Sequence, residues 1–118
     1  MPTHIEVGRR GEDLARTYLE QHGYQILQTN WRFRRAEVDL IALDPREVLV
    51  FVEVKTRSDE RFGPPETAVG DKKRQFLLAA ARAFMVAYEY DWEVRFDVIG
   101  VVLTEPPTVR HWTDVFYR

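Results

Sequence analysis

Apolar and polar positions along the chain predict two helices and five strands. Small and apolar residues recur at helical spacing over residues 5–22, and Gly23 follows at a position that suits a left-handed helix end. A second helix is predicted over 71–88, where the apolar residues form one stripe. Strand-forming residues are concentrated in five other segments, at 24–34, 36–43, 48–56, 92–103 and 109–116.

The order of these elements predicts how the strands are connected. The turn at residues 44–47 has Pro45 at a favoured position, so the second and third strands should be antiparallel. The second helix carries the chain from the third strand to the fourth, which is how a parallel neighbour is made. We therefore expect an α/β fold with a mixed central sheet and helices packed on it.

Length and composition limit the classes of protein that fit. The 118 residues are close to the usual length of one domain, and with 45% hydrophobic residues the chain is not disordered. Without repeats or linker-like segments, residues 1–118 are expected to form a single domain. The chain has no cysteine, which excludes disulfides and thiolate zinc sites. Its apolar stretches are only strand length and no leader pattern is found, so a soluble cytoplasmic protein is expected.

The charge balance excludes a protein held on nucleic acid by bulk positive charge alone. Lysine and arginine number 17 against 19 acids, which gives a formal charge of −2. The bases lie mostly before residue 83, so the near-zero total hides a local arrangement. Binding of a polyanion would therefore depend on a local cluster of bases.

The third strand brings charged residues next to an apolar centre. Its side chains alternate, so four valines lie on one face and the other face ends in Glu53 and Lys55. The second strand splits in the same way, with Val38 expected on the valine face and Glu37 and Asp39 on the other. Matching the apolar residues of the two strands places Asp39 opposite Glu53 and Glu37 opposite Lys55. A slip by one residue would put these charges into the core.

Two readings of this charge pair stay open on the pattern alone. Facing carboxylates have Cβ atoms ~5 Å apart and repel each other, which a divalent cation would offset. Lys55 could then position or deprotonate a water molecule, or neutralise phosphate charge, and metal, water and phosphate together describe phosphodiester hydrolysis. The other reading is a solvated charge ladder in which Lys55 merely screens Glu53 and Glu37.

The same strand segments carry a family resemblance. Residues 36–41, Ala-Glu-Val-Asp-Leu-Ile, followed by residues 50–57, Val-Phe-Val-Glu-Val-Lys-Thr-Arg, resemble the core of the PD-(D/E)XK restriction-endonuclease-like nucleases. More narrowly, the chain is similar to the small bacterial YraN (UPF0102) family, over residues 8 to about 102. The resemblance implies an α-β-β-β-α-β core, in agreement with the order read from the pattern.

Carried over position by position, the resemblance implies roles for four residues. Asp39 and Glu53 would be magnesium ligands and Lys55 the catalytic lysine. Glu12 matches the helix acid that Holliday-junction resolvases of this superfamily place near the metal. Ala36 stands where glycine is usual, but this change removes no proposed ligand.

The implied function is that of a Mg²⁺- or Mn²⁺-dependent endonuclease hydrolysing DNA phosphodiester bonds, with branched, flapped or single-stranded DNA as candidate substrates. Junction resolvases of this superfamily work as dimers, so a homodimer is a further expectation, and no membrane partner is expected. Two alternatives stay open: a nucleic-acid-binding module of the same fold that does not cut, and an interaction protein whose acid pair is structural.

Nucleic acid would need positive groups around the acids, because phosphate contacts supply most non-specific affinity. The candidates are Arg9, Arg10, Arg32, Arg34, Arg35, Arg57, Arg61, Lys72, Lys73 and Arg74. Cations at the start of the second helix oppose its macrodipole, which a bound phosphate or Asp71 as N-cap would offset. Trp31 and Phe33 alternate with arginines, and either stacking on unpaired bases or core packing fits them.

Overall fold

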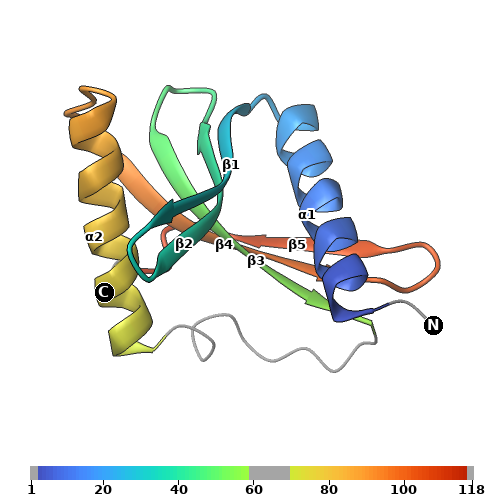
Figure 1. The fold of residues 1–118 in the computed structure, drawn as a ribbon. Coiled ribbons are helices and arrows are strands. Elements are labelled where there is room, and N and C mark those ends of the chain that lie inside the picture. The colour runs from blue at the N-terminus through green and yellow to red at the C-terminus, as the bar shows by residue number, and fades with distance from the viewer. Residues whose placement is uncertain (1–2, 59–69, 117–118) are drawn as a thin grey trace.

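The computed structural model describes residues 3–58 and 70–116, which form a mixed sheet with one helix on each face (Figure 1). In chain order the elements are α1 (His4–Gln21), β1 (Gln25–Phe33), β2 (Ala36–Leu43), β3 (Leu49–Arg57), α2 (Asp71–Ala87), β4 (Val94–Val102) and β5 (Thr108–Trp112). The strands lie side by side in the order β1-β2-β3-β4-β5, with β3 and β4 parallel and the other neighbours antiparallel. This confirms the predicted α/β fold and its order, which is compatible with a restriction-endonuclease-like core.

Local signals fix both ends of α1. The helix starts with a capping box, in which Glu6 N–H donates to Thr3 Oγ1 and Thr3 N–H donates to Glu6 Oε1, each at 3.1 Å. Gly23 follows the C-cap His22, and its φ of +85° belongs to the left-handed region that favours glycine. The prediction that Gly23 closes this helix is confirmed. Neither helix of the described residues has an apolar stretch long enough to cross a bilayer.

The face of the sheet under α1 is built on small and branched residues. Ala15 and Leu19 are fully buried against a cluster formed by Leu40, Val50, Val52, Ile99 and Val101. Gly11 lies so close to the side chain of Thr56 that a Cβ would overlap it. The missing side chain therefore lets the first half of α1 approach β3, and it brings the next residue, Glu12, beside the sheet.

Aromatic rings fill the opposite face, under α2. Phe84 of this helix meets Phe51 of β3 edge-on, with ring centroids 5.8 Å apart, and Trp31 of β1 in the same way at 5.4 Å. Leu77, Ala80 and Ala81 complete the buried side of the helix. These contacts pack α2 on the sheet, and the candidate site lies where its first turns reach the beginning of β2 and the second half of β3.

The pairing of β2 with β3 agrees with the prediction only for its apolar half. The ladder runs from the pair Leu43–Leu49 to the pair Leu40–Val52 and ends there. Beyond it, Asp39 Oδ2 accepts a hydrogen bond from the backbone N–H of Val54 at 2.7 Å, so a side chain takes the place of the next ladder bond.

The predicted ladder pairs Asp39–Glu53 and Glu37–Lys55 are therefore wrong, because the strands diverge at this point. The alternation of β2 shifts by one residue at Asp39. As a result Val38 lies in the core under α2, and not on the valine face under α1 as the sequence predicted.

Candidate functional site

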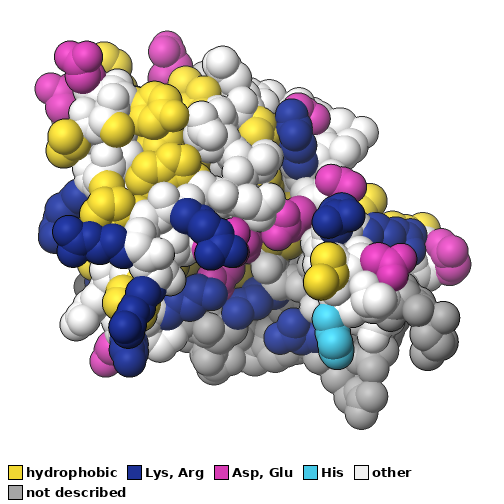
Figure 2. All heavy atoms as spheres, viewed as in Figure 1, with side chains coloured by type: hydrophobic (Ala, Val, Ile, Leu, Met, Phe, Trp, Pro, Cys, Tyr) yellow, Lys and Arg dark blue, Asp and Glu magenta, His cyan; other side chains and the backbone are white. Residues whose placement is uncertain are grey.

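A cleft of about 420 Å³ opens where β2 and β3 diverge under the start of α2. Its floor is apolar, formed by Ala36, Phe76 and Leu77. Its polar lining consists of Arg35, Glu37, Asp39, Glu53, Lys72 and Lys73. Figure 2 shows acidic side chains in the middle of the face between the two helices, with Lys and Arg side chains around them. The structure thus brings Asp39, Glu53 and three of the predicted bases into one hollow, and leaves Glu12 outside it.

Asp39 is a partly buried carboxylate for which the described residues provide one hydrogen bond. Burial raises its pKa to about 6, although the hydrogen bond from Val54 opposes the shift. Glu12, Glu53 and Glu37 add to the increase, because each carboxylate repels a negative charge on Asp39. Four acids therefore bear on one point of the sheet, which favours any positive charge that reaches it.

Glu53 is more deeply buried, with only 8% of its side chain exposed. Its Oε1 forms an ion pair with Lys73 Nζ from the first turn of α2. Its Oε2 lies 3.3 Å from Lys55 Nζ, an ion pair without the geometry of a hydrogen bond. Within the described residues Oε2 is a buried oxygen that accepts no hydrogen bond, and a buried acceptor left in this way normally costs about 1–3 kcal/mol.

Two carboxylates that line one cleft could hold a hard divalent cation that takes few protein ligands. Residues 3–58 and 70–116 contain no group of three or more acidic, histidine or cysteine side chains placed to hold a metal ion. Magnesium characteristically takes one or two carboxylates and completes its shell with water and substrate phosphates. Asp39 and Glu53, with the unsatisfied Oε2, match that donor set.

Glu12 lines a second hollow, a groove of about 600 Å³ between α1 and the β1–β2 hairpin. Its Oε1 accepts a hydrogen bond of 3.0 Å from Asn30 Nδ2. Glu37 lines both the groove and the cleft, and it forms an ion pair with Arg32 at 3.4 Å. Glu12 therefore acts on Asp39 through charge from the neighbouring groove, and its predicted role as a metal ligand stays a prediction.

Comparison with known proteins places the chain in a family. A model of an uncharacterised protein family, UPF0102, matches residues 11–101. The chain belongs to the UPF0102 family. It is 42% identical to a UPF0102 protein of Flavobacterium psychrophilum, covering all of this chain and 99% of that protein. A UPF0102 protein of Chlorobium chlorochromatii is 50% identical, with 95% and 92% of the two chains covered. The resemblance to the YraN family is thus confirmed.

The predicted basic residues of this UPF0102 chain fall into three groups. Arg35, Lys72 and Lys73 line the cleft, and Arg9 and Arg32 line the groove. The others lie elsewhere: Arg10 is exposed on α1, Arg34 stands over the ring of Phe33, Arg57 ends β3, and Arg74 donates to the backbone oxygen of Phe116. Arg61 lies outside the described residues.

Trp31 and Phe33 of this UPF0102 chain pack on each other and on the core. Their rings are nearly parallel, with centroids 6.4 Å apart, and both side chains are packed against the cluster under α2. Arg34 covers Phe33 at 5.1 Å from the ring centroid. Of the two expected roles, the structure shows core packing.

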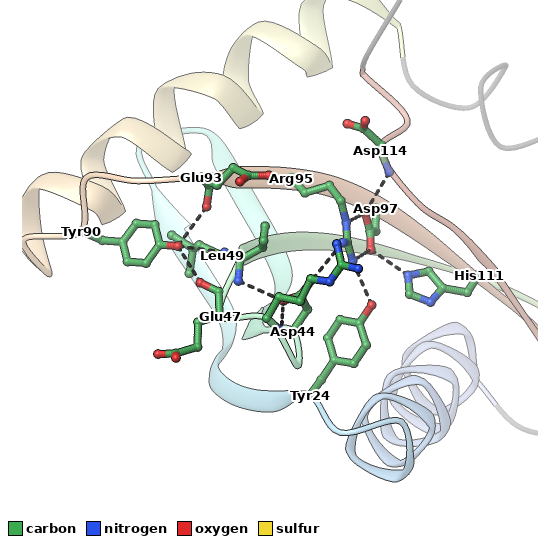
Figure 3. Close-up of polar contacts among 12 residues, drawn as sticks. Tyr24, Asp44, Glu47, Leu49, Tyr90, Glu93, Arg95, Asp97, His111 and Asp114 are labelled. Atoms are coloured by element: carbon green, nitrogen blue, oxygen red, sulfur yellow. Dashed lines mark hydrogen bonds and ion pairs between the residues drawn. The ribbon is translucent and has the colours of Figure 1, made fainter.

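A further buried carboxylate is Asp97 of β4, and the sequence alone left open which face of the sheet it takes. Figure 3 shows Arg95 holding it with two hydrogen bonds of 2.9 Å, from Nε to Oδ1 and from Nη2 to Oδ2. His111 Nε2 lies 2.7 Å from Oδ2, and the backbone N–H of Asp114 donates to Oδ1 at 3.0 Å. Burial alone would raise the pKa of Asp97, but these bonds together hold it below its ordinary value.

The guanidinium of Arg95 connects this carboxylate to two other segments of the UPF0102 chain. It donates to Asp44 Oδ2 in the β2–β3 turn at 3.0 Å and to the hydroxyl of Tyr24 at 2.9 Å. The sequence did carry a signal for part of this network, because residues two apart on a strand share a face and Arg95 and Asp97 have that spacing. His111, which the sequence left without a role, comes from β5 and could not be placed before the register of that strand was known.

Proposed function

We propose that this UPF0102 protein is a Mg²⁺- or Mn²⁺-dependent endonuclease that hydrolyses phosphodiester bonds of DNA. The observation that carries the proposal is Glu53 Oε2, a buried carboxylate oxygen that accepts no hydrogen bond from the described residues and shares a cleft with Asp39. Proteins seldom bury such an atom without a hydrogen bond, and here the ammonium of Lys55 lies 3.3 Å from it as an ion pair only. A divalent cation between the two carboxylates would provide one and would reduce their mutual repulsion.

The residues around the cleft divide the work of the proposed reaction. Asp39 and Glu53 would hold the cation, and Glu12 and Glu37 strengthen the negative potential at Asp39. When bound, the cation supplies Lewis-acid stabilisation of the phosphate and a water of lowered pKa. The ammonium of Lys55 lies beside Glu53, where it can donate a hydrogen bond to the attacking water or to a phosphate oxygen.

Cations of the cleft wall account for binding of the DNA backbone. Arg35 and Lys72 line the cleft and are exposed, so they can contact phosphates that flank the reacting one. The same residues support the second candidate function, a nucleic-acid-binding module that does not cut. The two functions differ in whether Asp39 and Glu53 are needed.

The test is cleavage by the purified protein of junction, flap, single-stranded and duplex DNA, with Mg²⁺, with Mn²⁺ and with EDTA. We expect cation-dependent cleavage of at least one substrate, lost in Asp39→Asn and in Lys55→Ala. Glu20→Gln is the matched control, because Glu20 forms an exposed ion pair with Arg16 at 3.5 Å and lines neither hollow.

Each outcome separates the candidate functions. Cleavage that survives Asp39→Asn would point to a contaminating nuclease and contradict the proposal. Salt-sensitive binding of DNA without cleavage would favour the binding module. If DNA is neither bound nor cut and no divalent cation changes the Tm, the acid pair is structural and the protein is an interaction protein.

A further inference from the structure

Lys73 lies at a position of α2 where a lysine does not stabilise the helix. It lies in the first turn of α2, where the helix dipole disfavours a positive charge. The N-cap is Gly70, not Asp71 as one sequence alternative had it, and the cap makes no side-chain hydrogen bond. The contact that offsets this placement is the ion pair of Lys73 with Glu53 Oε1.

The two lysines on Glu53 differ in exposure and in the element from which they come. Lys55 is on the same strand as Glu53, two residues further on, and 21% of its side chain is exposed. Lys73 reaches the carboxylate from the helix across the cleft, and 45% of its side chain is exposed. Its ammonium can therefore leave Glu53 by rotation of its own side chain into the cleft, without disturbing the core.

A divalent cation and the Lys73 ammonium would compete for the carboxylate of Glu53. Both are positive, and the repulsion between them at such short range opposes simultaneous binding at Glu53. In the protein without a cation, Lys73 neutralises a carboxylate that would otherwise be buried with Lys55 alone. Once the cation takes that role, Lys73 lies free in a cleft that its neighbours Lys72 and Arg35 also line.

We propose that Lys73 is an exchangeable counter-cation of Glu53: it neutralises the carboxylate when no divalent cation is present, and it is displaced when one binds. The displaced ammonium then becomes a ligand for a phosphate of the nucleic acid. This inference rests on the proposed function, because it assumes that Glu53 takes part in cation binding. It adds a mechanism by which the cleft gains affinity for phosphate only when the cation is present.

Lys72 provides a matched control for this inference. It precedes Lys73 on α2, lines the same cleft and carries the same charge, but it forms no ion pair with a described residue. Removing either lysine lowers the positive potential of the cleft by one charge. Only removal of Lys73 takes away a direct competitor for Glu53.

The first measurement is calorimetric titration of the full chain with Mn²⁺ in the absence of DNA. Lys73→Gln should bind Mn²⁺ on the order of tenfold more tightly than wild type, a gain that corresponds to the loss of one competing ion pair at a buried carboxylate. Lys72→Gln should stay within about twofold of wild type, because an exposed charge without a direct contact is largely screened. Lys73→Arg, which restores the charge, should return the affinity toward that of wild type.

Each result of this titration bears on the inference. If Lys73→Gln and Lys72→Gln gain equally, or neither gains, exchange at Glu53 is wrong while the proposed function stands. Binding by Lys73→Gln but not by wild type would support the exchange in its strongest form. If neither protein binds Mn²⁺ at millimolar concentration, both the exchange and the cation-dependent function are overturned.

The second measurement is DNA affinity with and without Ca²⁺, on the substrate that binds best. Lys73→Gln should weaken DNA binding several-fold when Ca²⁺ is present and leave it unchanged in EDTA, where Lys73 is held by Glu53. Lys72→Gln should weaken binding to the same extent in both conditions. An equal effect of Lys73→Gln with and without the cation would show that Lys73 is a constant phosphate contact and would overturn the exchange.

Discussion

Two aspartates of the same sheet, Asp97 buried and Asp39 partly buried, have opposite environments. Asp97 on β4 is held by Arg95, His111 and the backbone of Asp114, which together keep its pKa below the ordinary value. Asp39 on β2 accepts a single hydrogen bond from the described residues, and burial raises its pKa to about 6. Lost hydration acts to raise the pKa of both, so what separates them is the number of donors that the fold supplies.

The number of hydrogen-bond donors distinguishes a structural carboxylate from a candidate reactive one in this protein. The network around Asp97 joins β4 to β5 and to the turn at Asp44, and its donors satisfy both carboxylate oxygens. At the cleft, by contrast, Glu53 Oε2 has no hydrogen bond and Asp39 is surrounded by other acids. A buried acid that the chain leaves short of donors is available to a ligand from outside.

The largest effect expected from this comparison is loss of stability in Asp97→Asn. An amide cannot carry the charge that pairs with Arg95, so the partly buried guanidinium would lose its two-bond ionic partner and keep only the ion pair with Asp44. We expect the free energy of unfolding to fall by about 3–5 kcal/mol. Urea denaturation at pH 7 measures it.

Asp114→Asn is the control for this loss, because Asp114 contributes its backbone N–H and its exposed side chain stands at a positive φ that asparagine tolerates. It should change the free energy of unfolding by less than about 0.5 kcal/mol. A loss below about 1 kcal/mol in Asp97→Asn would mean that the network is not what holds β5 in place.

Ionised Asp39 in the cleft should lower the free energy of unfolding, whereas ionised Asp97 raises it. In the cation-free protein the pKa of Asp39 is about 6, above its ordinary value of 3.8, so the folded state disfavours the ionised form. This loss in the free energy of unfolding is absent below about pH 4 and grows as the pH rises from about 4 to about 6. Above pH 6 it reaches at most about 3 kcal/mol.

Asp39→Asn should therefore be as stable as wild type near pH 4 and more stable at pH 7. Thermal unfolding in EDTA at a series of pH values would show the difference between the two proteins. A variant that is less stable than wild type at pH 7 would place Asp39 in the same class as Asp97. Measurements at lower pH test Asp97. Its pKa is lowered in the folded protein, so the stability that it contributes is lost only as the pH falls below about 4.

The apolar pattern was sufficient to predict most of the fold. Period-two alternation placed Phe51 opposite Ile41, and the structure has that pair. The parallel arrangement of β3 and β4 followed from the helix between them. These features depend on the burial of one whole face of a strand or helix. Such burial determines the residue type at many positions of the sequence, so it can be predicted.

The candidate site depends on tertiary contacts that the alternation of apolar and polar residues does not predict. Asp39 replaces a ladder bond because two strands diverge, and Lys73 meets Glu53 because α2 starts above that point. Sequence reasoning placed both carboxylates in one site but through a cross-strand pair that does not form. It treated Lys73 as one base among many, since neither the height of the helix over the sheet nor its rotation is encoded in local spacing.

A smaller effect should come from the hydroxyl of Tyr24, which accepts a hydrogen bond from Arg95. Tyr24→Phe leaves the two bonds from Arg95 to Asp97 in place, so we expect a loss of only about 1 kcal/mol in urea denaturation. Tyr88→Phe is the control, because the Tyr88 hydroxyl accepts an exposed hydrogen bond from Gln28. Equal losses in the two variants would show that the Arg95 network adds nothing beyond an ordinary surface hydrogen bond.

The smallest effect concerns Glu12, which acts on Asp39 through space. Glu12→Gln keeps an oxygen that can accept the hydrogen bond from Asn30, so it removes the charge and leaves the contact. We expect the pKa of Asp39 to fall and the free energy of unfolding at pH 7 to change by less than about 0.5 kcal/mol. Carbon-13 NMR of the aspartate carboxyls measures the pKa, with Asp13→Asn as the control from the same groove. An unchanged pKa would mean that lost hydration and the shortage of donors account for the raised pKa of Asp39, and that the acid on α1 has no electrostatic link to the cleft.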